Sequence, residues 1–139
     1  MGTKGPNMIA VVVAAVLHWL LGAGWFTLFK AQWLMGMGTT SGQMMAASAG
    51  SPAWLPHVIT LVANLVMAYV LGWLIVATGP QNVMRGLQVA AIVWAGFVAS
   101  TWATEYAFEG RSVEIFGINA GYPLVGLLIM GVVLGAWKK

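Results

Sequence analysis

The sequence predicts an all-α integral membrane protein with four transmembrane helices in an up-down-up-down bundle. Apolar residues make up 60% of the 139 residues and charged residues only 6%, against roughly 25% charged residues in an ordinary soluble domain. The chain also contains four apolar runs, each long enough for the roughly 20 helical residues that a hydrocarbon core about 30 Å thick requires. We therefore expect a single transmembrane domain over residues 1–139.

The spans are expected in order along the chain, and the only acidic residue inside them is Glu105, near the end of the third span. Their ranges are 8–29, 57–77, 87–108 and 116–137. Short turns join the second span to the third and the third to the fourth, which favours antiparallel neighbours. A long outer loop at 30–56 joins the first two spans, and within it residues 42–47 are expected to form a short interfacial helix capped by Ser41.

Pro123 falls inside the fourth span. A proline within a helix removes one hydrogen bond and crowds the carbonyl four residues earlier, here that of Asn119. The helix either kinks at this point or begins at Pro123 after an irregular lead-in. A start at Pro123 would leave a short span, so we expect the kink.

The basic residues predict the orientation. Lys4, Arg85, Lys138 and Lys139 fall on one side of the expected bundle, and Lys30 and Arg111 fall on the other. The positive-inside rule therefore places both termini in the cytoplasm. The bases are spread along the chain and do not form a basic face, which argues against nucleic-acid binding.

Small residues recur every four positions along the third span. In lipid, helices associate mainly where small residues let their backbones approach closely. We therefore expect this series to be a packing surface, within the bundle or against another copy. Its members are Ala91, Ala95, Ala99, Ala103 and Ala107.

Polar residues gather toward the outer half of the expected bundle. They are His57, Asn64, Glu105, Glu109, Arg111, Asn119 and Tyr122. One interpretation is an outward-facing ligand pocket, as in a small transporter. The other is an ion-pair and hydrogen-bond network that fixes the hairpin of the third and fourth spans. We favour the network, because desolvation of Glu105 at the membrane interface is modest.

Two features bear on cofactors, although we predict none. His18 lies near mid-membrane between Ala14 and Gly22, and small neighbours leave room for a haem or chlorophyll-type macrocycle. Such a histidine more often hydrogen-bonds a neighbouring helix. Thioether sulfur suits Cu(I), but methionine is also common in adaptable apolar segments. The methionines concerned are Met35, Met37, Met44 and Met45.

Other chemistry has little support in the sequence. With two histidines and neither cysteine nor aspartate, a zinc or di-iron site is not expected. We see no Ser-His-Asp set, no Gly-rich phosphate loop and no paired carboxylates at depth, so we expect no enzyme.

Two motifs carry a family resemblance. Phe108-Glu109-Gly110-Arg111 and Asn119-Ala120-Gly121-Tyr122 lie in a C-terminal stretch, and the first span ends on an aromatic motif over residues 22–30 followed by Trp33. In these features the chain resembles the bacterial membrane family catalogued as domain of unknown function 1761. The resemblance implies a small four-helix protein of the bacterial cytoplasmic (inner) membrane, and it implies no activity.

These features favour a non-enzymatic protein that acts by helix packing. It would be an accessory or structural subunit of a larger membrane complex, or a homo-oligomer, with the bilayer and other membrane subunits or copies of itself as partners. The alternatives are a small oligomeric channel or transporter that uses the outward-facing pocket, and a pigment- or haem-binding subunit that uses His18.

Overall fold

The computed structural model describes residues 5–139, and over these residues the chain is helical with no strand. Four helical stretches are long and apolar enough to cross a membrane. They are α1 (Met8–Leu28), α4 (Leu55–Thr78), the continuous stretch Val83–Glu109, and α7 (Val113–Ala136). The prediction of an all-α chain with four long apolar spans is confirmed. Lys4, one of the bases used for the orientation, lies outside the described residues.

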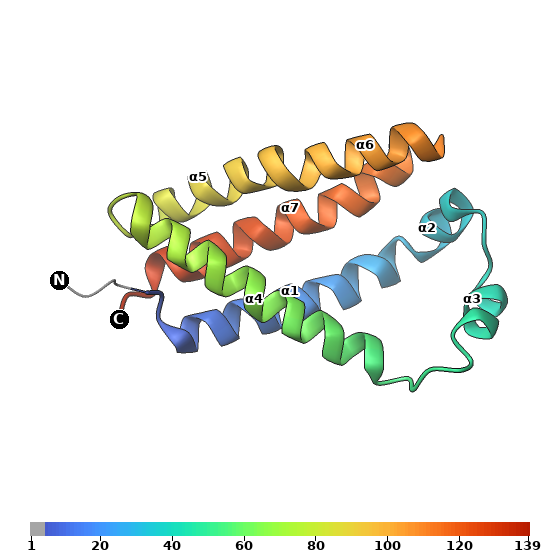
Figure 1. The fold of residues 1–139 in the computed structure, drawn as a ribbon, viewed down its shortest axis with the longest axis horizontal. Helices are drawn as coiled ribbons and strands as arrows, with labels where there is room; N and C mark the ends of the chain where they lie inside the picture. Colours follow the sequence, from blue (N-terminus) through green and yellow to red (C-terminus); the bar gives the residue numbers. More distant parts are fainter. Residues whose placement is uncertain (1–4) are drawn as a thin grey trace.

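The third stretch contains a π-helical segment in its middle. It consists of α5 (Val83–Val93), the π-helical segment η1 (Trp94–Ala99) and α6 (Ser100–Glu109). Figure 1 shows the four long stretches lying along one another, with the start of α1, the end of α7 and the α4–α5 connection at one end of the molecule. The α6–α7 turn and the segments between α1 and α4 lie at the opposite end.

Side-chain caps set several helix starts. The Asn82 side chain accepts a hydrogen bond from the Arg85 backbone N–H (2.8 Å), so the third stretch begins at Val83 and not at the expected residue 87. Ser112 accepts from the Ile115 N–H (3.3 Å), which moves the start of α7 from residue 116 to Val113. These caps lengthen both spans beyond their apolar runs.

The long connection over residues 30–56 contains the short helix that was expected at 42–47 and one helix that was not expected. It contains α2 (Lys30–Met37), which ends at Gly38 with a left-handed φ of 69°, and α3 (Ser41–Ala47). The cap of α3 is Thr40, and not Ser41 as expected. The Thr40 hydroxyl accepts from the Gln43 N–H (3.2 Å), and the Gln43 side-chain oxygen accepts from the Thr40 N–H (3.1 Å).

Pro123 lies inside α7, so the helix does not begin there. Two tryptophans donate to carbonyls just before the proline. Trp25 Nε1 donates to the Ile118 carbonyl (3.0 Å), and Trp94 Nε1 donates to the Ala120 carbonyl (2.8 Å). These indole bonds flank the Asn119 carbonyl, whose helical N–H partner the proline removes. Neighbouring helices thereby help α7 to accommodate the proline.

α7 is the centre of the packing. It contacts α1, α4 and α5, and its closest approach is to α5, where a Cβ on Gly86 would overlap the Gly131 carbonyl. One buried cluster joins α1, α4, α5 and α7, and includes Ala14, Leu71 and Met130. A second, aromatic cluster lies around Tyr106, Ile115 and Ile118. The bundle is therefore held by close backbone contact at one end and by aromatic side chains at the other.

Candidate functional site

Three helices meet in a buried polar network around His18 of α1. The His18 and Asn64 side chains are only 3% and 4% exposed. His18 Nδ1 lies 3.1 Å from Asn64 Oδ1 and 3.0 Å from the Tyr122 hydroxyl, which also donates to the His18 carbonyl (3.1 Å). Asn64 Nδ2 donates to the Ala15 carbonyl (3.4 Å). This network links α1, α4 and α7 within the bundle.

The hydrogen bonds assign the tautomer of His18. Asn64 Oδ1 can only accept, so Nδ1 carries the proton and Nε2 is an acceptor. In the described part of the chain Nε2 is buried without a hydrogen-bond partner. The ring lies against Gly126, where a Cβ would overlap Nε2.

The small residues near His18 are used by the protein's own side chains. A Cβ on Gly22 would come within 2.8 Å of the Tyr122 hydroxyl, and Gly126 gives room to the imidazole itself. The residues present therefore do not fit a macrocycle at His18, because helix α7 occupies the space that such a ring would need.

A second network lies toward the end of the molecule that carries α2. Trp33 Nε1 donates to Asn119 Oδ1 (3.0 Å), and Asn119 Nδ2 donates to the Tyr106 hydroxyl. Asn119 thus joins α2, α6 and α7 through both ends of its amide. Tyr106 is buried, and Trp33 and Asn119 are half-buried.

The remaining polar residues of the expected cluster are spread over the surface. Arg111 Nε pairs with Glu109, with side chains 27% and 48% exposed, so the pair contributes little to stability. Glu105 is exposed and has no ion-pair partner among residues 5–139. His57 is exposed on α4, where its Nδ1 accepts from Trp19 Nε1 (3.4 Å).

A cavity of about 420 Å³ gathers part of this cluster. Glu109, Arg111, Asn119 and Tyr122 line it, and most of the remaining lining is aromatic. Of the seven residues expected in one outer pocket, these four come together. Asn64 belongs to the His18 network, and His57 and Glu105 lie outside this cavity.

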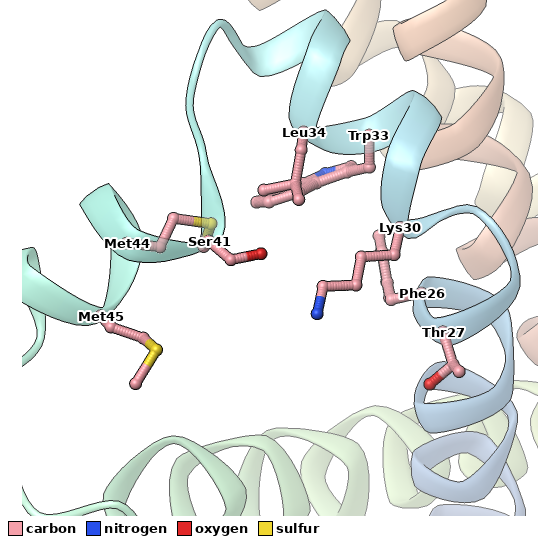
Figure 2. A pocket seen from close by; sticks show the side chains of 8 residues that line it. All are labelled: Phe26, Thr27, Lys30, Trp33, Leu34, Ser41, Met44 and Met45. Carbon is pink, nitrogen blue, oxygen red and sulfur yellow. The ribbon is translucent and has the colours of Figure 1, made fainter.

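A second cavity of about 560 Å³ lies beside the first, between the end of α1, α2 and α3 (Figure 2). Its walls are largely apolar, and its only charged lining residue is Lys30. Phe26 and Trp33 line both cavities and meet edge to face, with ring centroids 6.2 Å apart. This aromatic pair separates the two cavities. We call the cavity of about 560 Å³ the apolar cavity, and the cavity of about 420 Å³, which Glu109 and Arg111 line, the polar cavity.

The four methionines considered for copper do not line one cavity. Met44 and Met45 line the apolar cavity, and Met37 lines the polar cavity. Met35 is 82% exposed. Within the described residues, no group of three or more histidine or acidic side chains is arranged to hold a metal ion.

One interpretation had expected the small-residue series of the third stretch to pack within the bundle, but four of its five members are exposed. Ala91, Ala95, Ala103 and Ala107 are exposed, and Ala99 is half-buried. The inward-facing residues come one position before each alanine: Ala90, Trp94, Val98, Trp102 and Tyr106. We call the exposed alanine series the alanine face.

Comparison with known families agrees with this architecture. A family model described as "Protein of unknown function (DUF1761)" matches residues 9–135. The chain belongs to this family. No curated protein and no solved structure matches it. Membership in DUF1761 supports a small protein of four apolar helices, and it leaves the role to be argued from the site.

Several residues of the networks and cavities in this DUF1761 protein were missed from the sequence. Trp25, Trp33 and Trp94 donate hydrogen bonds between helices, and Lys30 and Ser41 line the apolar cavity. The spacing of Trp94, Trp102 and Tyr106, at multiples of four, is a signal that could have identified the inward face. No comparable pattern marks Lys30 or Ser41.

Proposed function

We propose that this DUF1761 protein is a multi-pass protein of the bacterial cytoplasmic membrane, crossing up-down-up-down with both termini in the cytoplasm. The proposal is supported by four apolar spans and by the bases. Arg85 is in the first turn of α5 and Lys138 and Lys139 follow α7, at one end of the molecule, whereas Lys30 begins α2 and Arg111 follows α6, at the other end. We expect a cysteine introduced at position 138 to be labelled only from the cytoplasmic side. Labelling from the outside would contradict the proposed orientation.

Within that membrane, the protein acts without catalysis, by association through the alanine face. The observation that carries this proposal is that the third span is the least buried of the four while four of the five alanines in its series are exposed. Other small residues are used inside the monomer, as Gly86 is against Gly131 and Gly126 is against His18. The alanine face is thus a packing surface whose partner is another membrane helix.

Polar groups beside the alanine face do not oppose its burial. The Ser100 hydroxyl donates to the Gly96 carbonyl (2.7 Å), and the Thr104 hydroxyl donates to the Ser100 carbonyl (3.0 Å). Each hydroxyl is satisfied within its own helix, so a partner helix can cover it without leaving an unpaired donor. A Cβ on Gly96 would meet no atom within 4 Å, so backbone approach is open there.

The test is the mass of the native assembly after purification in mild detergent. We expect the wild type to carry a second copy or a stoichiometric foreign subunit, and Ala95→Leu with Ala103→Leu to release it, because two larger side chains separate the backbones. Ala77→Leu is the matched control, since Ala77 is exposed on α4 outside this face. A wild type that is monomeric without any partner would overturn the proposal.

A second function is favoured by the polar cavity of about 420 Å³, which places Glu109, Arg111 and Asn119 together. In this alternative the protein is a small oligomeric channel or transporter with an outward-facing ligand site. Glu109→Gln would then abolish flux in proteoliposomes while the fold is retained, and Glu105→Gln would not, because Glu105 does not line the cavity. Flux that is equal in both variants would contradict this function.

A further inference from the structure

The apolar cavity combines hydrophobic walls with one cation. Phe26, Trp33, Leu34, Met44 and Met45 provide the walls. Lys30 and Ser41 point their polar atoms into the same space from opposite sides (Figure 2). In the part of the chain that the structure describes, the ion pair joins Arg111 to Glu109, and Lys30 has no carboxylate partner. An anionic group therefore fits beside Lys30 and Ser41.

Helix α3, which borders this cavity, has few protein contacts of its own. None of the residues of α3 is buried. Figure 1 shows α3 set apart from the long helices and held by its two connections. Met44 and Met45 nevertheless face the cavity. An occupant with an apolar part would cover these thioethers and tie α3 to α1 and α2.

The position of Lys30 matches the depth of a lipid headgroup. Lys30 is the first residue of α2 and lies two residues after the end of α1, a span of 21 residues, and Trp33 lies one turn further on. Lysine and tryptophan at the end of a span are typical of the membrane interface. Anionic lipids are attracted to basic side chains at that depth.

We propose that this cavity binds one bilayer lipid with an anionic headgroup. The headgroup lies between Lys30 and Ser41, and the upper part of an acyl chain lies along Phe26, Leu34 and the two methionines. The volume of about 560 Å³ falls in the range of about 300–1,000 Å³ that is usual for ligand sites. Flexible thioethers suit a chain without fixed shape. The inference rests on the membrane placement proposed above and is independent of the alanine face.

The experiment uses the full chain in phosphatidylcholine nanodiscs that contain phosphatidylglycerol with a photoreactive diazirine in its acyl chain. After irradiation, mass spectrometry maps the labelled peptides. We expect labelling of residues 26–34 and 41–47 above that of other lipid-facing segments. Lys30→Gln should lower it about fivefold, the effect of one basic residue on an anionic lipid. Lys30→Arg should preserve it.

Two controls make the outcome specific. Arg111→Gln removes the other cation at this end, which lines the polar cavity, and should leave the labelling unchanged. The same diazirine on phosphatidylcholine should label these residues no more than other lipid-facing segments. Equal labelling by both probes, or labelling that Lys30→Gln does not reduce, would overturn the proposed lipid site. A chain outside the bilayer would show no labelling of any span, which separates a failure of the membrane placement from a failure of this site.

Discussion

At the scale of single residues, the fold depends on Asn64 more than on any charged group. Its amide bonds both to His18 Nδ1 (3.1 Å) and to the Ala15 carbonyl (3.4 Å) in a buried place. The charged pair of Glu109 and Arg111 is exposed, where screening by water leaves it worth little. Among the polar contacts between side chains, the buried neutral hydrogen bonds therefore contribute more to stability than the exposed ion pair.

Asn64→Leu tests this directly. The substitution keeps a similar volume and removes both bonds of the amide, so that His18 Nδ1 keeps only the Tyr122 hydroxyl, 3.0 Å away. We expect the free energy of unfolding to fall by about 1–2 kcal/mol, measured by denaturant titration in detergent. Thr60→Val, one turn earlier on α4, is the control: the Thr60 hydroxyl bonds only within its own helix (2.7 Å to the Pro56 carbonyl). A loss equal to that of the control would refute the role of Asn64.

Gly126 is the second residue whose identity the packing fixes. A Cβ there would overlap the His18 ring, so Gly126→Ala should lower the free energy of unfolding by about 1–3 kcal/mol through overpacking. Gly117→Ala on the same helix meets no atom within 4 Å and should be neutral or slightly stabilising. Thermal unfolding of both variants checks this, and equal melting temperatures would contradict it.

At the scale of elements, the π-helical segment η1 keeps the inward face of the third stretch continuous. In an α-helix of 3.6 residues per turn, a series of positions four apart rotates by about 40° at each step. The wider turn of a π-helix offsets part of this rotation. Trp94, Val98, Trp102 and Tyr106 can therefore all face α7, although each lies four residues after the last.

The crossing of α5 and α7 is the tightest contact between elements. Gly86→Ala should push the helices apart, because its Cβ would overlap the Gly131 carbonyl, which cannot move like a side chain. We expect a loss of about 1–3 kcal/mol in the free energy of unfolding. Gly96→Ala, on the same stretch with open space around it, is the matched control. A Gly86→Ala variant as stable as this control would show that the crossing is looser than the structure has it.

The sequence predicted the four apolar helices well because their length and apolarity are properties of single segments. The helix starts shifted where a polar cap, Asn82 or Ser112, lies outside the apolar run. The polar cluster was predicted only in part. Depth along a span follows from position in the sequence, but the direction a side chain faces depends on which helix packs beside it.

The alanine series shows this limit clearly. Ala91 and its successors repeat every four residues, and so do Ala90 and the aromatic residues that follow it. The periodicity of the third span is therefore the same for two neighbouring faces. α7 packs against the one that carries Trp94, Trp102 and Tyr106, where indole and hydroxyl groups find partners on α7.

At the scale of the whole molecule, the closest backbone contacts and the two cavities of the site lie at opposite ends. Gly86, Gly131 and Gly135 bring backbones together near one end. Both large cavities of the site lie at the other end and share Phe26 and Trp33. This arrangement leaves the proposed lipid site at the end with α2 and α3, apart from the close contacts between α5 and α7.

The most direct test of association through the alanine face is site-specific photo-crosslinking in native membranes. The chain contains no cysteine, so a single cysteine at Ala95 or, as control, at Val66 on the lipid-exposed side of α4 can carry a benzophenone maleimide. We predict a strong adduct of defined mass, to a second copy or one foreign subunit, from position 95 and little from position 66. Equal yields from both positions, or no adduct from position 95, would contradict the account.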